Sequence, residues 1–268
     1  MKSVRPLLIL LALLLLSAAP AWAIANDANS ADNVIRQALA RAQKRCDVVG
    51  QAGYTYTKVT VTEELDGTGK VTDRQERMYE VQFQSGSTYL KLVELNGKPL
   101  APSDMKKQAE NESKFYRLLG QSKNGKGDRR ENFLTADLVA RFDFTLACRE
   151  EMNGRPAYQL KFQPKNPPPP SRHIIDRFLD RMSGTLWIDT EDFEIARVDI
   201  RLGSQVDLLG GVLGSLKKMA FTLMRTRLAD GQWLNVSSSG DFEGRKLLDS
   251  TRYKTSSRSI NFKPISLR

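Results

Sequence analysis

Four carboxylates fall within six residues of the stretch GTLWIDTEDFEIARVDIRL (184–202), and clustered acids can bind metals or act as acid–base catalysts. They are Asp189, Glu191, Asp192 and Glu194. Apolar and polar residues alternate on both sides of DTED, which predicts two strands joined by a turn. Asp is favoured in turns because its side chain bonds nearby backbone N–H groups. Catalytic or metal-binding carboxylates instead converge from separate elements, so we interpret these acids as hydrated turn residues.

The single histidine, His173, is followed by Asp176 and Asp180 on one predicted surface helix. No nucleophile accompanies them, whereas catalytic triads assemble from separate, converging elements. Histidines and cysteines are not clustered as zinc ligands are. The sequence therefore predicts a protein that is not an enzyme, with no catalytic residues, no metal and no cofactor.

Cys46 and Cys148 are the two cysteines of the chain. A disulfide between them would persist in an oxidising compartment. It would close a loop of roughly 100 residues, worth about 4 to 5 kcal/mol in the chain-entropy model. The sequence does not place the two sulfurs side by side, so a disulfide and two free thiols remain alternatives.

The first 23 residues have the pattern of a cleaved export signal. Lys2 and Arg5 precede the apolar run 7–16, and Ala21 and Ala23 are the small residues that signal peptidase requires. The apolar run is shorter than the roughly 20 residues of a membrane span. We therefore expect a signal peptide over residues 1–23 and a soluble, exported domain over residues 24–268.

The formal net charge is +10. Basic side chains favour anionic surfaces such as lipid head groups, to which each contributes about 1 kcal/mol. Nucleic acid is not an expected partner of an exported protein. A basic surface that is merely well solvated is the alternative.

Hydrophobic periodicity predicts a mixed fold dominated by antiparallel strands. An amphipathic helix is expected over 30–46, strands over 54–65, 77–84 and 88–95, helices over 103–119 and 131–141, a hairpin over 142–163, and a closing meander over 219–260. The four prolines 167–170 cannot form a central strand. They predict a stiff connector, with docking to a polyproline-recognition module as the alternative.

Two apolar segments follow the prolines. Ile174, Ile175, Phe178, Leu179 and Met182 share one face of a predicted helix. The segment QVDLLGGVLGSLKKMAF (205–221) combines leucines with three glycines, which weaken a helix. It is either a buried loop that fills one end of a barrel or a movable lid over an apolar cavity.

The exported helix, the run of hairpins, YEVQFQSGSTYLKLVELNGKPL (79–100), GTLWIDTEDFEIARVDIRL and the closing meander together resemble the LolA-like superfamily of periplasmic lipoprotein carriers and related proteins. The resemblance implies an α+β fold: a strongly curved antiparallel sheet that forms a half-open β-barrel. It also implies an N-terminal helix and lid helices that cover the concave face. Residues 24–268 would form a single half-barrel domain.

The resemblance further implies a periplasmic carrier that holds a lipid or an acylated protein in an apolar cavity. Burial of each methylene contributes about 0.8 kcal/mol. We expect the cavity and lid to be lined by Ile174, Ile175, Phe178, Met182, Leu208, Leu209, Val212, Leu213, Leu216 and Met219. Partners would be acyl chains, envelope proteins or the envelope membrane surface. The alternative is a structural or protein-interaction module of the cell envelope whose cavity is filled by its own side chains.

Overall fold

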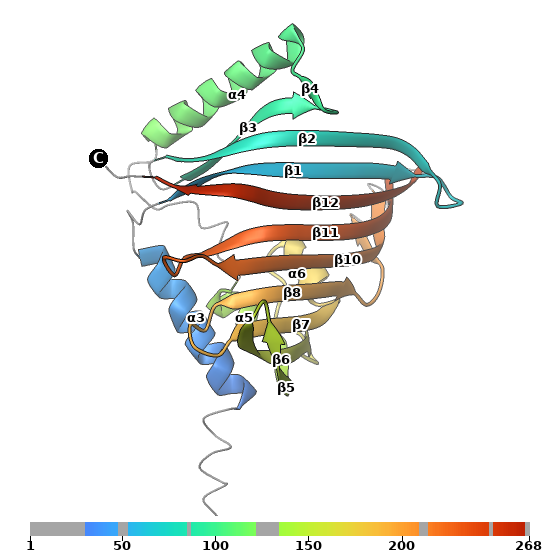
Figure 1. The fold of residues 1–268 in the computed structure, drawn as a ribbon. Coiled ribbons are helices and arrows are strands. Elements are labelled where there is room, and N and C mark those ends of the chain that lie inside the picture. Colours follow the sequence, from blue (N-terminus) through green and yellow to red (C-terminus); the bar gives the residue numbers. More distant parts are fainter. Residues whose placement is uncertain are drawn as a thin grey trace, which may run out of the picture.

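The computed structural model shows a strongly curved antiparallel sheet with helices at both of its ends (Figure 1). It describes residues 30–47, 53–84, 87–121, 134–208, 214–246 and 249–265. The sheet has 12 strands in the order β4-β3-β2-β1-β12-β11-β10-β8-β7-β6-β5, and β9 pairs with β10 beside this path. The sheet is not closed, because β4 and β5 form its two edges. This confirms the predicted curved, open and mostly antiparallel sheet.

The strands are β1 Tyr54–Leu65, β2 Val71–Gln84, β3 Ser87–Leu95, β4 Lys98–Pro99, β5 Phe142–Met152, β6 Arg155–Pro164, β7 Met182–Asp189, β8 Ile195–Leu202, β9 Val206–Leu208, β10 Gly214–Arg227, β11 Trp233–Lys246 and β12 Asp249–Pro264. The described helices are α3 Ala31–Asp47, α4 Pro102–Gln121, α5 Ala136–Val139 and α6 Ile174–Leu179. Two hairpin turns are made by Asn-Gly pairs at 96–97 and 153–154, in which all four residues have positive φ. Asn and Gly tolerate this left-handed conformation, which matches the twist of the flanking strands.

The helices divide between the two ends of the sheet (Figure 1). Helix α4 lies along the β3–β4 end, whereas α3, α5 and α6 lie at the end formed by β5–β8. Helix α3 begins after Ser30, whose Oγ accepts a hydrogen bond from the Asn33 amide at 3.3 Å. Its buried residues Val34, Ile35 and Ala38 join the main core. Within the described residues, no helix has both the length and the apolarity to span a bilayer.

One row of opposed residues shows how the core is distributed across the sheet. It runs from β5 to β2 in the order Leu146, Leu160, Leu186, Val198, Leu223, Ser238, Ser257, Thr60, Arg77. We call the face that carries this row the core face and the opposite one the polar face. The row changes from aliphatic to polar between β10 and β11. The main core therefore lies over β5–β8 and β10, which we call the closed half. It does not extend over β11, β12 and β1–β3, which we call the long-strand half.

Every residue of β1 from Tyr54 to Glu64 is half-exposed, on both faces of the sheet. In the closed half, by contrast, Leu160 and Ile188 are completely buried. The two halves thus share one hydrogen-bonded sheet but differ in burial.

Three predicted elements are shorter or of another type in the structure. The helix expected over 131–141 is the single turn α5, and 131–133 lie outside the described residues. The helix after the prolines ends at Leu179, and Met182 begins β7. Most of the predicted lid segment is strand, because Leu216 pairs with Val206 in the β9–β10 hairpin. Residues 214–221 of the segment, which we expected to be a loop or a lid, belong to β10, and β10 pairs with β11 along its length.

Candidate functional site

The acidic turn between β7 and β8 is held together by Asp189, whose exposed fraction is only 1%. Its carboxylate accepts hydrogen bonds from Arg155 Nε at 2.6 Å and Nη2 at 2.9 Å, and from the amides of Glu191 and Asp192 at 3.0 and 2.8 Å. Burial raises the pKa of Asp189, but the bonds from Arg155 and the two amides outweigh it, so the pKa is lowered. The predicted turn is confirmed. The prediction that its acids are simply hydrated is wrong for Asp189.

Glu194 is also buried, with an exposed fraction of 5%. It accepts from Arg225 at 2.8 Å, and from Arg41 of α3 at 3.1 Å. Arg225 also donates to the backbone carbonyls of Ile195 and Trp233. These bonds attach the first helix and β11 to the turn. The carboxylate of Glu194 is thus part of the contacts between strands and helix α3.

Arg141, at the start of β5, clamps the tetraproline segment and α6 to the closed half. Its guanidinium lies 2.8 Å from Asp176 and 2.9 Å from Asp180, and donates to the carbonyls of Pro169 and Pro170. Asp176 also accepts from the backbone amides of residues 172 and 173. These amides and Arg141 lower the pKa of Asp176 despite its burial. The acids after the histidine therefore serve a structural clamp, and the prolines form the predicted stiff connector.

The predicted cavity residues are not gathered into one described site. Met182 faces Leu202 across the β7–β8 pair and Met219 faces Phe242 across β10–β11; both methionines are half-buried. Leu216 and Phe178 are half-buried, whereas Ile175 is 53% exposed. The side chains of Ile174 and Leu208, and residues Leu209, Val212 and Leu213, lie outside the described residues. Leu179, which we did not include, is the α6 residue that packs against the main core.

Cys148 is exposed on β5, and its Sγ lies 3.5 Å from Gln159 Oε1. The side chain of Cys46 lies outside the described residues. The disulfide therefore stays a prediction.

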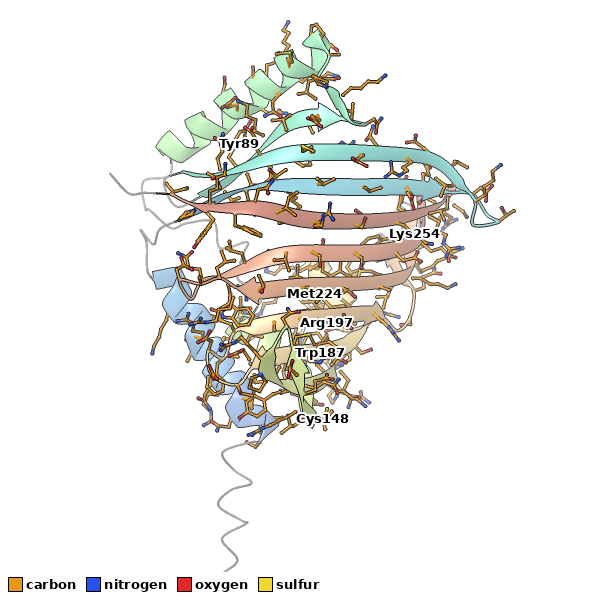
Figure 2. All side chains as sticks on the ribbon, in the orientation of Figure 1. Tyr89, Cys148, Trp187, Arg197, Met224 and Lys254 are labelled. Atoms are coloured by element: carbon orange, nitrogen blue, oxygen red, sulfur yellow. The ribbon has the colours of Figure 1, made fainter. Side chains whose placement is uncertain are left out.

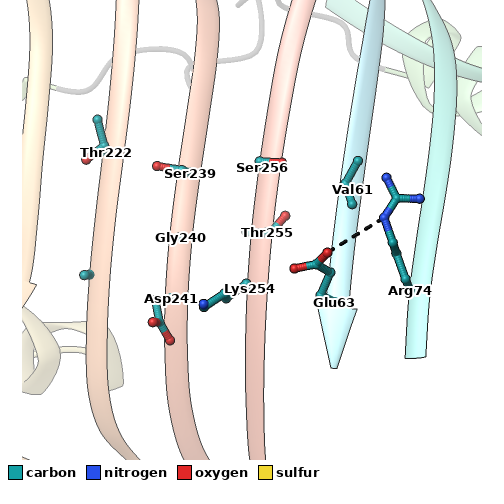
Figure 3. A pocket seen from close by; sticks show the side chains of 11 residues that line it. Val61, Glu63, Arg74, Thr222, Ser239, Gly240, Asp241, Lys254, Thr255 and Ser256 are labelled. Atoms are coloured by element: carbon teal, nitrogen blue, oxygen red, sulfur yellow. Dashed lines mark ion pairs between the residues drawn. The ribbon is translucent and has the colours of Figure 1, made fainter. Parts of the chain in front are cut away.

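A hollow of about 530 Å³ lies on the polar face, across β1, β2 and β10–β12 (Figure 3). The hydroxyls of Thr222, Ser239 and Ser256 lie on its floor, and Glu63 pairs with Arg74 at 3.7 Å on its rim. Such a lining is suited to polar groups and not to acyl chains. Arg197, Met224 and Lys254, which are labelled in Figure 2, lie on the same face of the sheet as this hollow.

A second hollow of about 360 Å³ lies between α3, α5 and β5. Ile35, Leu39, Val139, Phe142 and Phe144 make its apolar part. Because most of these side chains also contact the main core, the hollow continues the core to the surface at the β5 edge.

The core face of the long-strand half is the surface best suited to an amphiphile. Aromatic side chains occur at both ends of its strands: Tyr56 and Phe262 have ring centroids 5.1 Å apart, and Phe242 lies opposite Tyr253. Between them are hydroxyl groups, among them those of Ser238 and Ser257, 2.8 Å apart. We predicted an apolar cavity lined by residues between Ile174 and Met219, and not this surface with its polar middle. The signal was present in YTYTKVTVTEEL (54–65), in which period-two alternation places a lysine and two threonines on the same face as the tyrosines.

Within the described residues, His, Cys, Asp and Glu side chains do not gather in groups of three as a metal site would require.

No protein-family model matches the chain, and no curated protein matches it in sequence. Among solved structures, a LolA superfamily protein from Nitrosomonas europaea matches with 12% identity and a TM-score of 0.33, over 89% of this chain and 95% of that one. A putative outer membrane lipoprotein-sorting protein domain from Vibrio parahaemolyticus matches with 12% identity and a TM-score of 0.35, over 87% and 95%. The Pseudomonas aeruginosa MucA/MucB complex matches with 11% identity and a TM-score of 0.26, over 88% and 100%.

Proposed function

We propose that the chain is an exported, periplasmic binding protein that is not an enzyme. After removal of residues 1–23, its single half-barrel domain would hold a lipid or an acylated protein on the core face. The observation that carries the proposal is the unequal burial of this face. Helices and side chains fill the closed half, while the long-strand half stays half-exposed along the length of β1.

An amphiphile would bury the most apolar surface where the two halves of the sheet meet. Met219 and Phe221 on β10 and Phe242 on β11 continue the apolar surface of the core, and all three are half-buried. An acyl chain laid against them would remove further apolar surface from water, with about 0.8 kcal/mol for each buried methylene. The adjacent hydroxyls would remain available to polar groups of the ligand.

The proposal is tested by lipid extraction and by an acyl probe. Mass spectrometry of organic extracts of the purified protein should detect co-purified lipid, and a fluorescent fatty-acyl probe should bind saturably. Met219→Gln should weaken probe binding. Lys218→Gln is the matched control, because Lys218 is the preceding residue and is exposed on the polar face. No lipid and no probe binding in the unmodified protein would contradict the proposal.

The alternative, an envelope interaction module with a self-filled cavity, is favoured by the packing of the closed half. There Phe142, Phe144 and Phe162 fill the space next to α3 with mutual ring contacts of 5.2 to 6.4 Å. This reading expects no bound lipid in the extracts. It also expects Met219→Gln to lower stability without affecting any ligand.

A further inference from the structure

We propose that Lys58 and Arg77 form a binding site for the anionic head group of the amphiphile, a phosphate or a carboxylate. The inference rests on the proposed function and names the class of ligand that it would select. It is carried by two neighbouring cations on the core face that the described protein leaves without a counter-ion.

The strand register places the two side chains together. Lys58 of β1 lies opposite Tyr79 of β2, and Arg77 lies opposite Thr60, two residues further along β1. The two cations are therefore diagonal neighbours on the same face, a spacing of roughly 7 to 8 Å between backbones that long side chains readily bridge. Both are half-buried.

Within the described residues, neither side chain has an ion pair or a hydrogen bond. Apart from Arg77, the residues directly opposite Lys58 on the two neighbouring strands are uncharged: they are Tyr79 on β2 and Ser259 on β12. The acids of the same two strands on this face, Glu64 and Asp73, are opposite each other. Asp73 is four residues from Arg77, roughly 13 Å along an extended strand.

Several other arginines of the chain form ion pairs with acidic side chains. The guanidiniums of Arg141, Arg155 and Arg225 each lie within 2.9 Å of a carboxylate oxygen. Arg74, on the polar face of β2, contacts Glu76 at 3.0 Å. Lys58 and Arg77 have no such carboxylate partner among the described residues.

Two unpaired like charges at half-buried positions oppose folding, because each loses hydration and repels the other. Burial accordingly lowers the pKa of Lys58. A bound anion would remove the repulsion and replace the lost hydration with charge-assisted hydrogen bonds. The hydroxyls of Tyr79 and Thr60, directly opposite the two cations, supply further donors.

The surroundings favour a head group that carries an acyl chain. Tyr56 precedes Lys58 by two residues on the same face, and its ring contacts that of Phe262. Leu92 of β3 lies opposite Tyr79. Apolar contacts therefore begin directly beside the two cations, where the first methylenes of a lipid would lie.

Calorimetric titration of the full mature chain with three ligands, each below any micelle concentration, tests this site. The ligands are dodecyl phosphate, dodecyl maltoside with the same chain but no charge, and inorganic phosphate. Dodecyl phosphate should bind at least about tenfold tighter than dodecyl maltoside, as one or two charge-assisted hydrogen bonds predict. Inorganic phosphate alone should bind much more weakly than either amphiphile.

Lys58→Met and Arg77→Met should each weaken dodecyl phosphate binding about tenfold, the loss expected for one hydrogen bond to a charged group. Binding of dodecyl maltoside should not change in these variants. Lys58→Arg, which keeps the positive charge, should bind dodecyl phosphate about as tightly as the unmodified protein. Lys254→Met is the matched control, because Lys254 is an exposed lysine on the polar face.

Equal affinity for the two amphiphiles, or unchanged phosphate affinity in Lys58→Met, would overturn the head-group site and leave the proposed function standing. Absence of binding to both amphiphiles would overturn the proposed function as well. Binding of inorganic phosphate as tight as that of dodecyl phosphate would also overturn the head-group site, because the chain would then contribute nothing.

Discussion

Arg225 is the most buried cation of the acidic turn, with an exposed fraction of 3%. Its contacts with Glu194 and two backbone carbonyls show that the acids of this stretch hold strands together. Buried charges persist only when they are paired and hydrogen-bonded. The arrangement also explains why Asp192 is not an ordinary surface acid: it accepts from Arg227 at 2.6 Å and from Trp233 Nε1 at 2.9 Å.

Replacing one member of the buried pair should therefore be costly. We expect Glu194→Gln to lower the free energy of unfolding by about 3 kcal/mol or more, since it leaves Arg225 buried without a counter-charge. Glu191→Gln is the control, and it should stay within about 0.5 kcal/mol because Glu191 is exposed. Urea denaturation of both variants measures the difference. Equal midpoints would show that the pair contributes little.

Replacement of Lys58, unlike that of Glu194, should stabilise the protein. Burial lowers the pKa of Lys58, so the charged side chain destabilises the folded protein at neutral pH. The stability of the protein therefore rises as pH increases from the folded pKa towards the unfolded value of about 10.4. Lys58→Met should therefore stabilise the ligand-free protein at pH 7 and lose this advantage as pH rises through that window. Denaturant midpoints at a series of pH values provide the test. An advantage that does not vary with pH would contradict the assigned cause.

At the scale of elements, α6 has only six residues, and isolated helices of this length are unstable in water. Its position depends on Arg141, which reaches it through Asp176 and Asp180 while also binding the proline carbonyls. Prolines cannot pair in a sheet as donors, so a guanidinium that binds their carbonyls fixes the connector. This clamp argues that α6 is a fixed wall and not a moving lid.

The clamp should weaken in acid. The pKa of Asp176 is lowered in the folded state, so its stabilising contribution is present above its unfolded pKa of about 3.9 and is lost as pH falls through the folded pKa. Amide exchange over 174–181, corrected for the intrinsic effect of pH, should accelerate in this range. Asp176→Asn should show fast exchange already at pH 7, whereas exposed Arg172→Met should not. Slow exchange in Asp176→Asn would exclude the clamp.

The sequence predicted most single elements and the open antiparallel sheet, but not which side chains meet across it. Alternation located β1 at 54–65 exactly, and the apolar spacing of Val34, Ile35 and Ala38 located α3, because these signals are local. The change of the core face from apolar at Leu223 to polar at Ser238 depends on the register between strands. Asp176, the partner of Arg141, is more than thirty residues away in the sequence. Periodicity over one segment contains neither. For the same reason, Lys58 was read only as part of a strand.

At the scale of the whole molecule, the two halves of the sheet should differ in their response to a ligand. Binding to the native state adds stability, and the gain appears locally where opening is easiest. A saturating acyl ligand should therefore slow amide exchange in β1, β2 and β12 more than in β6 and β7. Exchange measured by mass spectrometry with and without dodecyl phosphate tests this. Protection confined to the closed half would place the ligand elsewhere.

Leu160→Ala should lower the stability of the protein without weakening its binding of an acyl ligand. Leu160 is completely buried in the main core, and removal of such a side chain costs about 2 to 5 kcal/mol. Acyl-probe affinity measured well below the new denaturation midpoint should remain close to that of the unmodified protein. A large loss of affinity in this variant would mean that the closed half is itself the binding surface.

The pairing of β1 with β12 also has a consequence for how the protein is made. Tyr54 lies opposite Pro264, so one of the first strands to be synthesised must wait for the last. Until then β1 has a free edge of twelve residues, and free edges are templates for pairing with other chains. Closing so long a loop is also slow. The open edge of β1 is therefore covered only after β12 has been synthesised.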